Sequence, residues 1–203
     1  MNKLNITMRG ERPDDYEAIL RLTYEAFLTL DYPGRRRMDE HYLIYLLQSS
    51  KHVISDLCFV AEYEGEIVGH ILYTKSSFKR PDNSEANTIT FGPLSVLPKY
   101  QRRGIGSTLV RHSMDKAQEL GYKAVLITGV PDYYPKLGFK RASSYNLILP
   151  DFPIPDAFMV YELKPEYLTG GGIYHSWAPE FDQAEDDDTG YEAFHKQFTE
   201  KFL

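Results

Sequence analysis

The stretch L-S-V-L-P-K-Y-Q-R-R-G-I-G-S-T-L, residues Leu94–Leu109, places a glycine-containing turn between an expected strand and an expected helix. The first N–H groups of a helix lack partners within the helix, and together with the helix dipole they bind phosphate. Gly104 and Gly106 carry no side chain that would hold a pyrophosphate away from these amides. Arg102 and Arg103 add positive charge beside them. The stretch therefore predicts a phosphate-binding turn.

Two other phosphate motifs fit this turn poorly. The ATP-binding P-loop needs a lysine after its last glycine, and Ser107 follows Gly106 here. The dinucleotide fingerprint needs a third glycine, where Leu109 stands. A strand-to-helix turn without any ligand remains the structural alternative.

The elements around the turn follow from hydrophobic periodicity and turn residues. Ala124 to Thr128 is a continuous apolar strand, so strand, helix and strand form a βαβ crossover. Pro93 removes a hydrogen-bond donor inside its strand and predicts a bulge there. The other expected elements are a strand at 5–9, helices at 16–30 and 39–49, a hairpin of 57–63 with 67–76, strand 88–96, helix 104–120, a short helix at 133–137, and a closing antiparallel pair of 145–149 with 158–163.

Composition limits the class of protein. The chain has 203 residues, 42% of them hydrophobic and 26% charged, as expected for a soluble globular protein with one main domain. A net charge of -6 opposes general binding to nucleic acid. The single cysteine, Cys58, excludes an internal disulfide, and the sequence has no signal-peptide pattern or long apolar run. We therefore expect a cytoplasmic protein that binds neither nucleic acid nor a membrane.

The pattern weakens after Leu163. The glycine run 170–172 and the acidic stretch 180–188 have a linker-like composition. Phe194, Phe198 and Phe202 recur every fourth residue, which predicts a terminal amphipathic helix from Tyr191 to Phe202. We therefore expect one domain at 1–165 and a C-terminal extension at 166–203. Contact with a second copy, giving a homodimer, and packing on the chain's own domain both fit this helix.

Two motifs together resemble the GNAT superfamily of N-acetyltransferases. The family's pyrophosphate loop [QR]-x-x-G-x-[GA] is matched by Gln101, Gly104 and Gly106, and Y-Y-P-K-L-G-F at 133–139 is similar to a second family motif. The resemblance covers about residues 6–163 and is strongest to the subgroup called YhbS-like. It implies an α/β GNAT fold, also called the acyl-CoA N-acyltransferase fold, with a mixed, mostly antiparallel central sheet flanked by helices.

The resemblance also implies acetyl-CoA as cosubstrate and assigns residues to it. The pantetheine arm would lie along Leu94, Ser95 and Val96, with the thioester carbonyl near the Val96 amide, a donor suited to a developing oxyanion. The pyrophosphate would be wrapped, mainly by backbone amides, by Gln101, Arg102, Arg103, Gly104, Ile105, Gly106 and Ser107.

Tyr134 aligns with the family tyrosine that returns a proton to the leaving thiolate. A phenol, with an unperturbed pKa of about 10, is protonated at neutral pH and suits that task. Tyr133 is the alternative. The family's usual base, a carboxylate on the bulged strand, has no counterpart in residues 88–96. The remaining candidate bases are His70, Glu40, His41, Asp132 and water.

The sequence contains neither the histidine spacing of a zinc enzyme nor a G-x-S-x-G nucleophile motif. We therefore expect no metal and no covalent acetyl-enzyme. The predicted function is an N-acetyltransferase, in which the amine of a small molecule or peptide attacks the thioester directly, with residues 31–41 and 150–155 selecting the acceptor. The alternative is a GNAT-fold module that binds acyl-CoA without catalysis.

Overall fold

The computed structural model describes residues 4–28, 30 and 37–203. The chain divides into two compact units. The first comprises residues 1–72, 93–110 and 179–203, and the second comprises residues 73–92 and 111–178. The chain passes between the units inside two strands and one helix, so each unit is described by itself.

The first unit combines antiparallel strands with four helices. Strand β1 (Thr7–Gly10) pairs with β2 (Phe59–Tyr63), which pairs with β3 (Glu66–Lys79) through the register Val60↔His70. Glu64 and Gly65, with φ of 50° and 82°, make the tight turn between β2 and β3. The helices are α1 (Tyr16–Phe27), α2 (Glu40–Leu47), α4 (Glu180–Asp186) and α5 (Asp188–Phe202).

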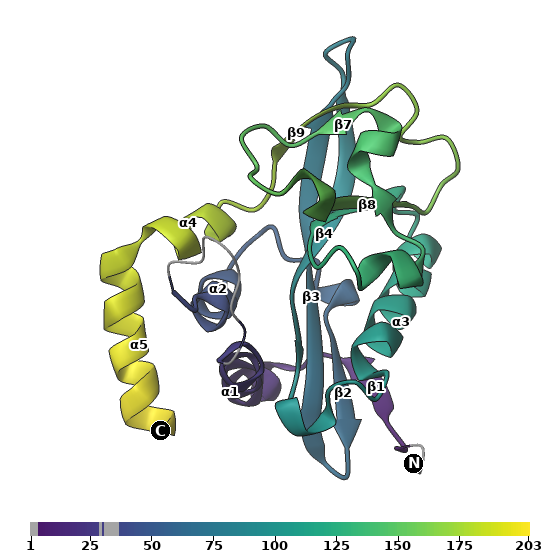
Figure 1. Ribbon diagram of the computed structural model, residues 1–203. Coiled ribbons are helices and arrows are strands. Elements are labelled where there is room, and N and C mark those ends of the chain that lie inside the picture. Colours follow the sequence, from purple (N-terminus) through teal and green to yellow (C-terminus); the bar gives the residue numbers. More distant parts are fainter. Residues whose placement is uncertain (1–3, 29, 31–36) are drawn as a thin grey trace. The chain divides into compact units, whose positions relative to one another are not determined.

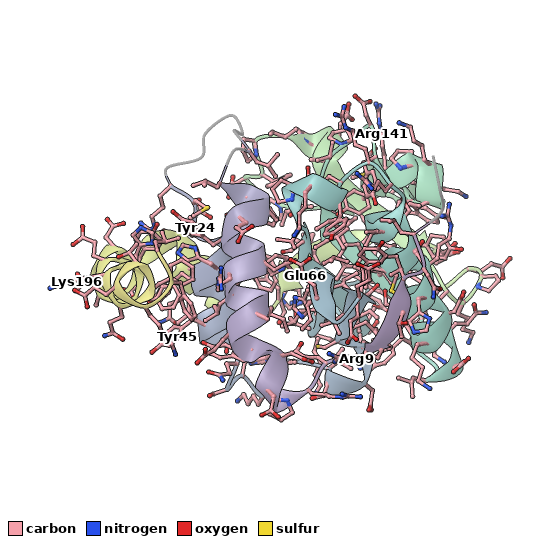
Figure 2. All side chains as sticks on the ribbon, turned by 90° about the horizontal axis from the view of Figure 1, so that it is seen from below. Arg9, Tyr24, Tyr45, Glu66, Arg141 and Lys196 are labelled. Carbon is pink, nitrogen blue, oxygen red and sulfur yellow. The ribbon has the colours of Figure 1, made fainter. Side chains whose placement is uncertain are left out.

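Helix α5 lies beside α1 and α2 in this unit (Figure 1). Phe198 packs on Tyr24 of α1, with ring centroids 4.9 Å apart, and Phe194 packs on Tyr45 of α2 at 4.7 Å. Figure 2 shows Tyr24 and Tyr45 on the side toward α5, whereas Lys196 lies on the outer side of α5. The expected amphipathic helix is confirmed, and its apolar face covers the chain's own helices. A homodimer stays a prediction.

The second unit contains the crossover and a second group of strands. Strand β4 (Glu85–Val96) runs parallel to β5 (Ala124–Thr128) with Ile89 opposite Val125. β5 pairs antiparallel with β8 (Phe158–Glu162), and β8 with β6 (Lys140–Arg141). β9 (Gly172–Ser176) pairs antiparallel with β3 and parallel with β7 (Leu147–Ile148). Phe78, Leu126, Phe158 and Tyr174 belong to the buried core of this unit.

The strand order β1-β2-β3-β4-β5-β8-β6, with β9 joining β3 to β7, is that of a mixed and mostly antiparallel sheet. Helix α3 (Ile105–Glu119) is the crossover between β4 and β5. The predicted fold class is confirmed. Short 3-10 helices cover Pro13–Asp15, Ser55–Leu57, Pro98–Tyr100, Tyr134–Leu137, Ala142–Tyr145 and Pro155–Ala157.

Four sequence predictions are wrong in detail. The antiparallel pair of 145–149 with 158–163 does not form, because β7 pairs with β9 while β8 pairs with β5 and β6. Strand β9 lies in a stretch expected to be irregular, and the acidic stretch 180–188 is largely helical. Helix α1 ends at Phe27 rather than Leu30. The division at residue 165 and the bulge at Pro93 stay predictions.

Candidate functional site

The turn between β4 and α3 is built from residues in unusual backbone conformations. Arg102 and Gly104 have φ of 57° and 87°, in the left-handed region. This region is easy for glycine and costs an arginine about 1–2 kcal/mol. Non-glycine residues kept in this region cluster at functional sites. Glu64, in the β2–β3 turn, shares this conformation, so the strain at Arg102 supports a candidate site here in combination with the sequence motif.

The first amides of α3 face outward from the helix end. Regular helical bonding starts where the Thr108 N–H donates to the Gly104 carbonyl oxygen at 2.9 Å, and the Thr108 hydroxyl reaches the same oxygen at 3.0 Å. By helix geometry, the Ile105 and Gly106 amides precede the first of these bonds. A Cβ added at Gly104 would meet no atom within 4 Å. The turn thus offers backbone donors, the positive end of a helix dipole and open space, which suits a phosphate group.

The side chains of the turn differ in their roles. Gln101, Arg102 and Arg103 are exposed, whereas the Ile105 side chain is 3% exposed. Gly69 of β3 lets α3 approach closely, because a Cβ there would lie 3.1 Å from Ile105 Cγ2. Ile105 can therefore contact a ligand only through its backbone. Its side chain anchors the start of α3 to the strand.

The charges near the turn are partly paired. Lys99 Nζ donates to Glu66 Oε1 at 2.8 Å, and this bond raises the pKa of Lys99. The Tyr100 hydroxyl donates to the same carboxylate at 3.2 Å. Arg103 lies over the Tyr100 ring, 5.9 Å from its centroid. Glu66 therefore pairs with Lys99. The positive charge that remains for a ligand at the turn comes from Arg102 and Arg103.

The end of β4 presents two amides in one direction. The Leu97 N–H donates to the Val68 carbonyl oxygen of β3 at 3.0 Å. Successive N–H groups along a strand point to opposite sides, so those of Leu94 and Val96 point away from β3. Gln101 Nε2 donates to the Val96 carbonyl oxygen at 2.9 Å and ties the strand end to the turn. The predicted pantetheine-binding strand and the predicted pyrophosphate-binding turn are thus joined by this side-chain hydrogen bond within the first unit.

Tyr134 belongs to the second unit and opens a 3-10 helix, Tyr134–Leu137. Its ring lies against Gly129, where an added Cβ would overlap it. Phe91 and Phe139 pack around it with ring centroids 5.7 and 5.6 Å away, and Tyr133 lies at 5.0 Å. Gly138, with φ of 96°, ends this short helix. The motif at 133–139 therefore holds the Tyr134 ring in an aromatic setting.

Comparison with known proteins decides the family. The profile described as acetyltransferase (GNAT) family matches residues 17–139, more than half of the chain. The chain belongs to this family. The uncharacterized N-acetyltransferase YjhQ of Escherichia coli K12 is 35% identical over 120 residues, which span 56% of this chain and 66% of YjhQ.

Two solved GNAT structures resemble the chain along most of its length. YhbS from Escherichia coli, in complex with CoA, gives a TM-score of 0.73 at 25% identity and covers 90% of this chain and 94% of that one. A GNAT acetyltransferase from Brucella melitensis, in complex with acetyl-CoA, gives 0.66 at 26% identity, with coverages of 88% and 99%. The chain spans less than two thirds of its curated relatives in sequence, 66% of YjhQ and 62% of YhbS. The resemblance to the YhbS-like subgroup is confirmed.

Two of the four candidate bases of this GNAT chain, both histidines, are fully buried. His70 and His41 are 0% exposed. His70 Nε2 lies 2.9 Å from Glu11 Oε2, and His41 Nε2 lies 3.1 Å from His195 Nδ1. Glu40 is half-buried at the start of α2, and Asp132 is exposed. A base must come within hydrogen-bond reach of the amine, which burial of both histidines opposes.

Sequence reasoning missed one contact with β4, the strand predicted to bind the donor. The hydroxyl of Thr23 in α1 lies 3.0 Å from the hydroxyl of Ser95. Thr23 lies on the buried, otherwise apolar face of α1 with Ile19, Leu20 and Ala26. The available signal was a hydroxyl at a stripe position, because a buried hydroxyl needs a partner.

The residues expected to select the acceptor are only partly described. Residues 31–36 lie outside the described part of the chain, and Arg37 follows them. Arg37 donates to the carbonyl oxygens of Ala184 and Glu185 at the end of α4, at 2.8 and 3.0 Å. Over the described ranges, no helix is long and apolar enough to span a membrane, and no cluster of His, Cys, Asp and Glu suits a metal ion.

Proposed function

We propose that this GNAT chain is an acetyl-CoA-dependent N-acetyltransferase. The observation that carries the proposal is the turn at the start of α3, where a strained Arg102 and an open Gly104 leave backbone donors facing outward. CoA and acetyl-CoA are bound by the two solved relatives named above, and they carry the pyrophosphate that such a turn suits. The cytoplasm remains the proposed location.

In this proposal the residues of the first unit hold the donor. The Ile105 and Gly106 amides receive the pyrophosphate, with Arg102 and Arg103 adding charge. The Leu94 and Val96 amides point away from β3, toward the side on which the donor's arm pairs with the strand. A bound acetyl-CoA supplies the activated acetyl group, and the acceptor amine attacks its thioester directly. The Val96 N–H then stabilises negative charge developing on the carbonyl oxygen.

Tyr134 is the proposed general acid, which returns a proton to the departing thiolate. The enzyme test uses Tyr134→Phe, with Tyr133→Phe as the matched control. We expect Tyr134→Phe to lower turnover about 100-fold, within the usual range for a positioned acid, and to leave the acetyl-CoA Kd unchanged. Turnover is measured with amino-acid esters, polyamines, an aminoglycoside and a peptide with a free N-terminus.

The outcomes answer two questions: which tyrosine is the acid, and whether the protein is an enzyme. If Tyr133→Phe lowers turnover while Tyr134→Phe does not, the acid is Tyr133. If calorimetry detects acetyl-CoA binding by the wild-type protein but every amine stays unmodified, the enzyme proposal fails. Binding of ATP or NAD in place of CoA would contradict the assignment of the turn.

A non-catalytic acyl-CoA-binding module is the second candidate. Residues 88–96 of β4 carry no carboxylate, and the only acid of this strand, Glu85 at its start, bonds to Ser77. Together with the buried His70 and His41, this leaves Glu40, Asp132 or water to accept the proton of the amine. The enzyme is preferred because the tyrosine motif at 133–139 is present and the Tyr134 ring is packed by Phe91 and Phe139, and the amine panel distinguishes the two functions.

A further inference from the structure

A buried pair of hydroxyl groups joins α1 to the proposed donor-binding strand. Thr23 Oγ1 and Ser95 Oγ lie 3.0 Å apart, and both residues are 0% exposed. Thr23 shares its helix face with Ile19, Leu20 and Ala26, all buried. In apolar surroundings a hydroxyl stays buried at low cost only when it is hydrogen bonded. The pair therefore fixes where Ser95 lies relative to α1.

Ser95 stands between the two residues whose amides point away from β3. On the β3 side, the strand end is held by the bond from Leu97 N–H to the Val68 carbonyl oxygen. At the turn, it is held by Gln101 Nε2 on the Val96 carbonyl oxygen. By the same alternation the Ser95 N–H points toward β3, which is a hydrogen-bonded neighbour of β4. Thr23 adds a side-chain contact from α1 to the Ser95 hydroxyl.

We propose that Thr23 is a positioning residue for acetyl-CoA. It touches no part of the donor itself. By holding the Ser95 hydroxyl, it sets the direction of the Leu94 and Val96 amides that pair with the pantetheine arm. The inference rests on the donor site of the proposed function, and it adds a residue of α1 to that site.

The test compares Thr23→Val, which keeps the side-chain shape and removes the hydroxyl, with Thr23→Ser, which restores a hydroxyl. The matched control is Thr88→Val, because Thr88 Oγ1 forms a similar buried pair with Ser76 Oγ at 2.8 Å in the second unit. The Kd of acetyl-CoA is measured by calorimetry. Amide chemical shifts of Leu94 and Val96 are followed during the same titration by NMR.

We expect Thr23→Val to weaken acetyl-CoA binding about fivefold, the size of one typical hydrogen bond, and to move both amide signals. Thr23→Ser and Thr88→Val should stay within about twofold of wild type. The double variant Thr23→Val with Ser95→Ala leaves no unpaired hydroxyl, so its melting temperature should recover while its Kd stays weakened. This separates positioning from stability.

Equal Kd values for Thr23→Val and wild type would overturn the inference, as would equal weakening by Thr88→Val. The Kd is measured without any acceptor amine. If the protein binds acetyl-CoA but modifies no amine, the enzyme proposal fails. The Kd values of Thr23→Val, Thr88→Val and wild type still decide whether Thr23 positions the strand. If the wild-type protein binds no acetyl-CoA, the inference falls together with the donor site.

Discussion

Replacing Gly104 with alanine tests whether this glycine serves the turn alone or also a ligand. Gly104 has φ of 87°, and a Cβ there would meet no protein atom within 4 Å. The change therefore creates no clash inside the protein and costs only the left-handed conformation, about 1–2 kcal/mol. For a protein of this size, each kcal/mol lowers the melting temperature by about 2–4 °C. We expect a fall of about 2–8 °C.

Gly121, just beyond the other end of α3, provides a matched control. Its φ is 82°, and a Cβ there also meets nothing within 4 Å. Gly121→Ala should therefore lower the melting temperature by the same amount as Gly104→Ala. Only the Gly104 methyl group would stand in the space proposed for the pyrophosphate. We expect Gly104→Ala to weaken acetyl-CoA binding at least tenfold, or about 1.4 kcal/mol, and Gly121→Ala to leave it unchanged.

The assay pairs thermal unfolding without ligand with calorimetric titration of acetyl-CoA. If Gly104→Ala melts earlier but binds acetyl-CoA like wild type, the glycine serves the turn alone and the placement of the pyrophosphate is refuted. If Gly121→Ala weakens binding equally, affinity follows stability, and the comparison gives no support to a phosphate site at Gly104.

Three further changes test other parts of the molecule. Gly129→Ala adds a methyl group that overlaps the Tyr134 ring. Turnover should therefore fall about tenfold or more, while the Kd of acetyl-CoA stays unchanged. Normal turnover would mean that the position of the ring is not critical. Asp187→Ala removes the carboxylate that caps α5, so the melting temperature and helical circular dichroism should both fall, and no change in either would contradict this role of the cap. Burial lowers the pKa of His195, which lies 3.1 Å from His41 and packs near Tyr24 and Tyr191. A histidine with a lowered pKa contributes its full stability above the unfolded value of about 6.5 and loses it as the pH falls toward the folded value. The free energy of unfolding should therefore fall between about pH 7 and 5 by denaturant titration, and less steeply in His195→Gln; parallel curves would contradict this.

Elements with strong local patterns could be predicted from the sequence. Residues 124–127 are all apolar and buried, and β5 spans Ala124–Thr128. Helix α3 was expected from Gly104 to Leu120 and spans Ile105–Glu119. In both cases a glycine or a change in periodicity marks the ends. Such signals are contained in the segment itself and need no distant partner.

Elements that depend on distant partners could not be predicted. Strand β9 is five residues long, and its partners are Ser77–Lys79 and Leu147–Ile148. Gly172, with φ of 150°, admits the close approach of the Lys79 carbonyl, which a Cβ would overlap. At least Gly172 of the glycine run is therefore needed for β9 to pair with β3. Composition alone could not distinguish a flexible linker from a strand that needs glycine for close pairing.

The candidate site divides along the same line. The turn between β4 and α3 could be predicted, because Gly104 takes the left-handed conformation that its position in the motif indicates; its role in binding the donor stays a prediction. The proton acceptor could not be predicted, because its identity depends on exposure, which tertiary packing sets. His70 and His41 look like bases in the sequence, yet each is fully buried and bonded to a side chain at least 59 residues away in sequence. The same packing makes Thr23 of α1 the hydrogen-bond partner of Ser95 in β4, the strand proposed to bind the donor. The position of this strand therefore depends on distant side chains, which a local sequence pattern does not specify.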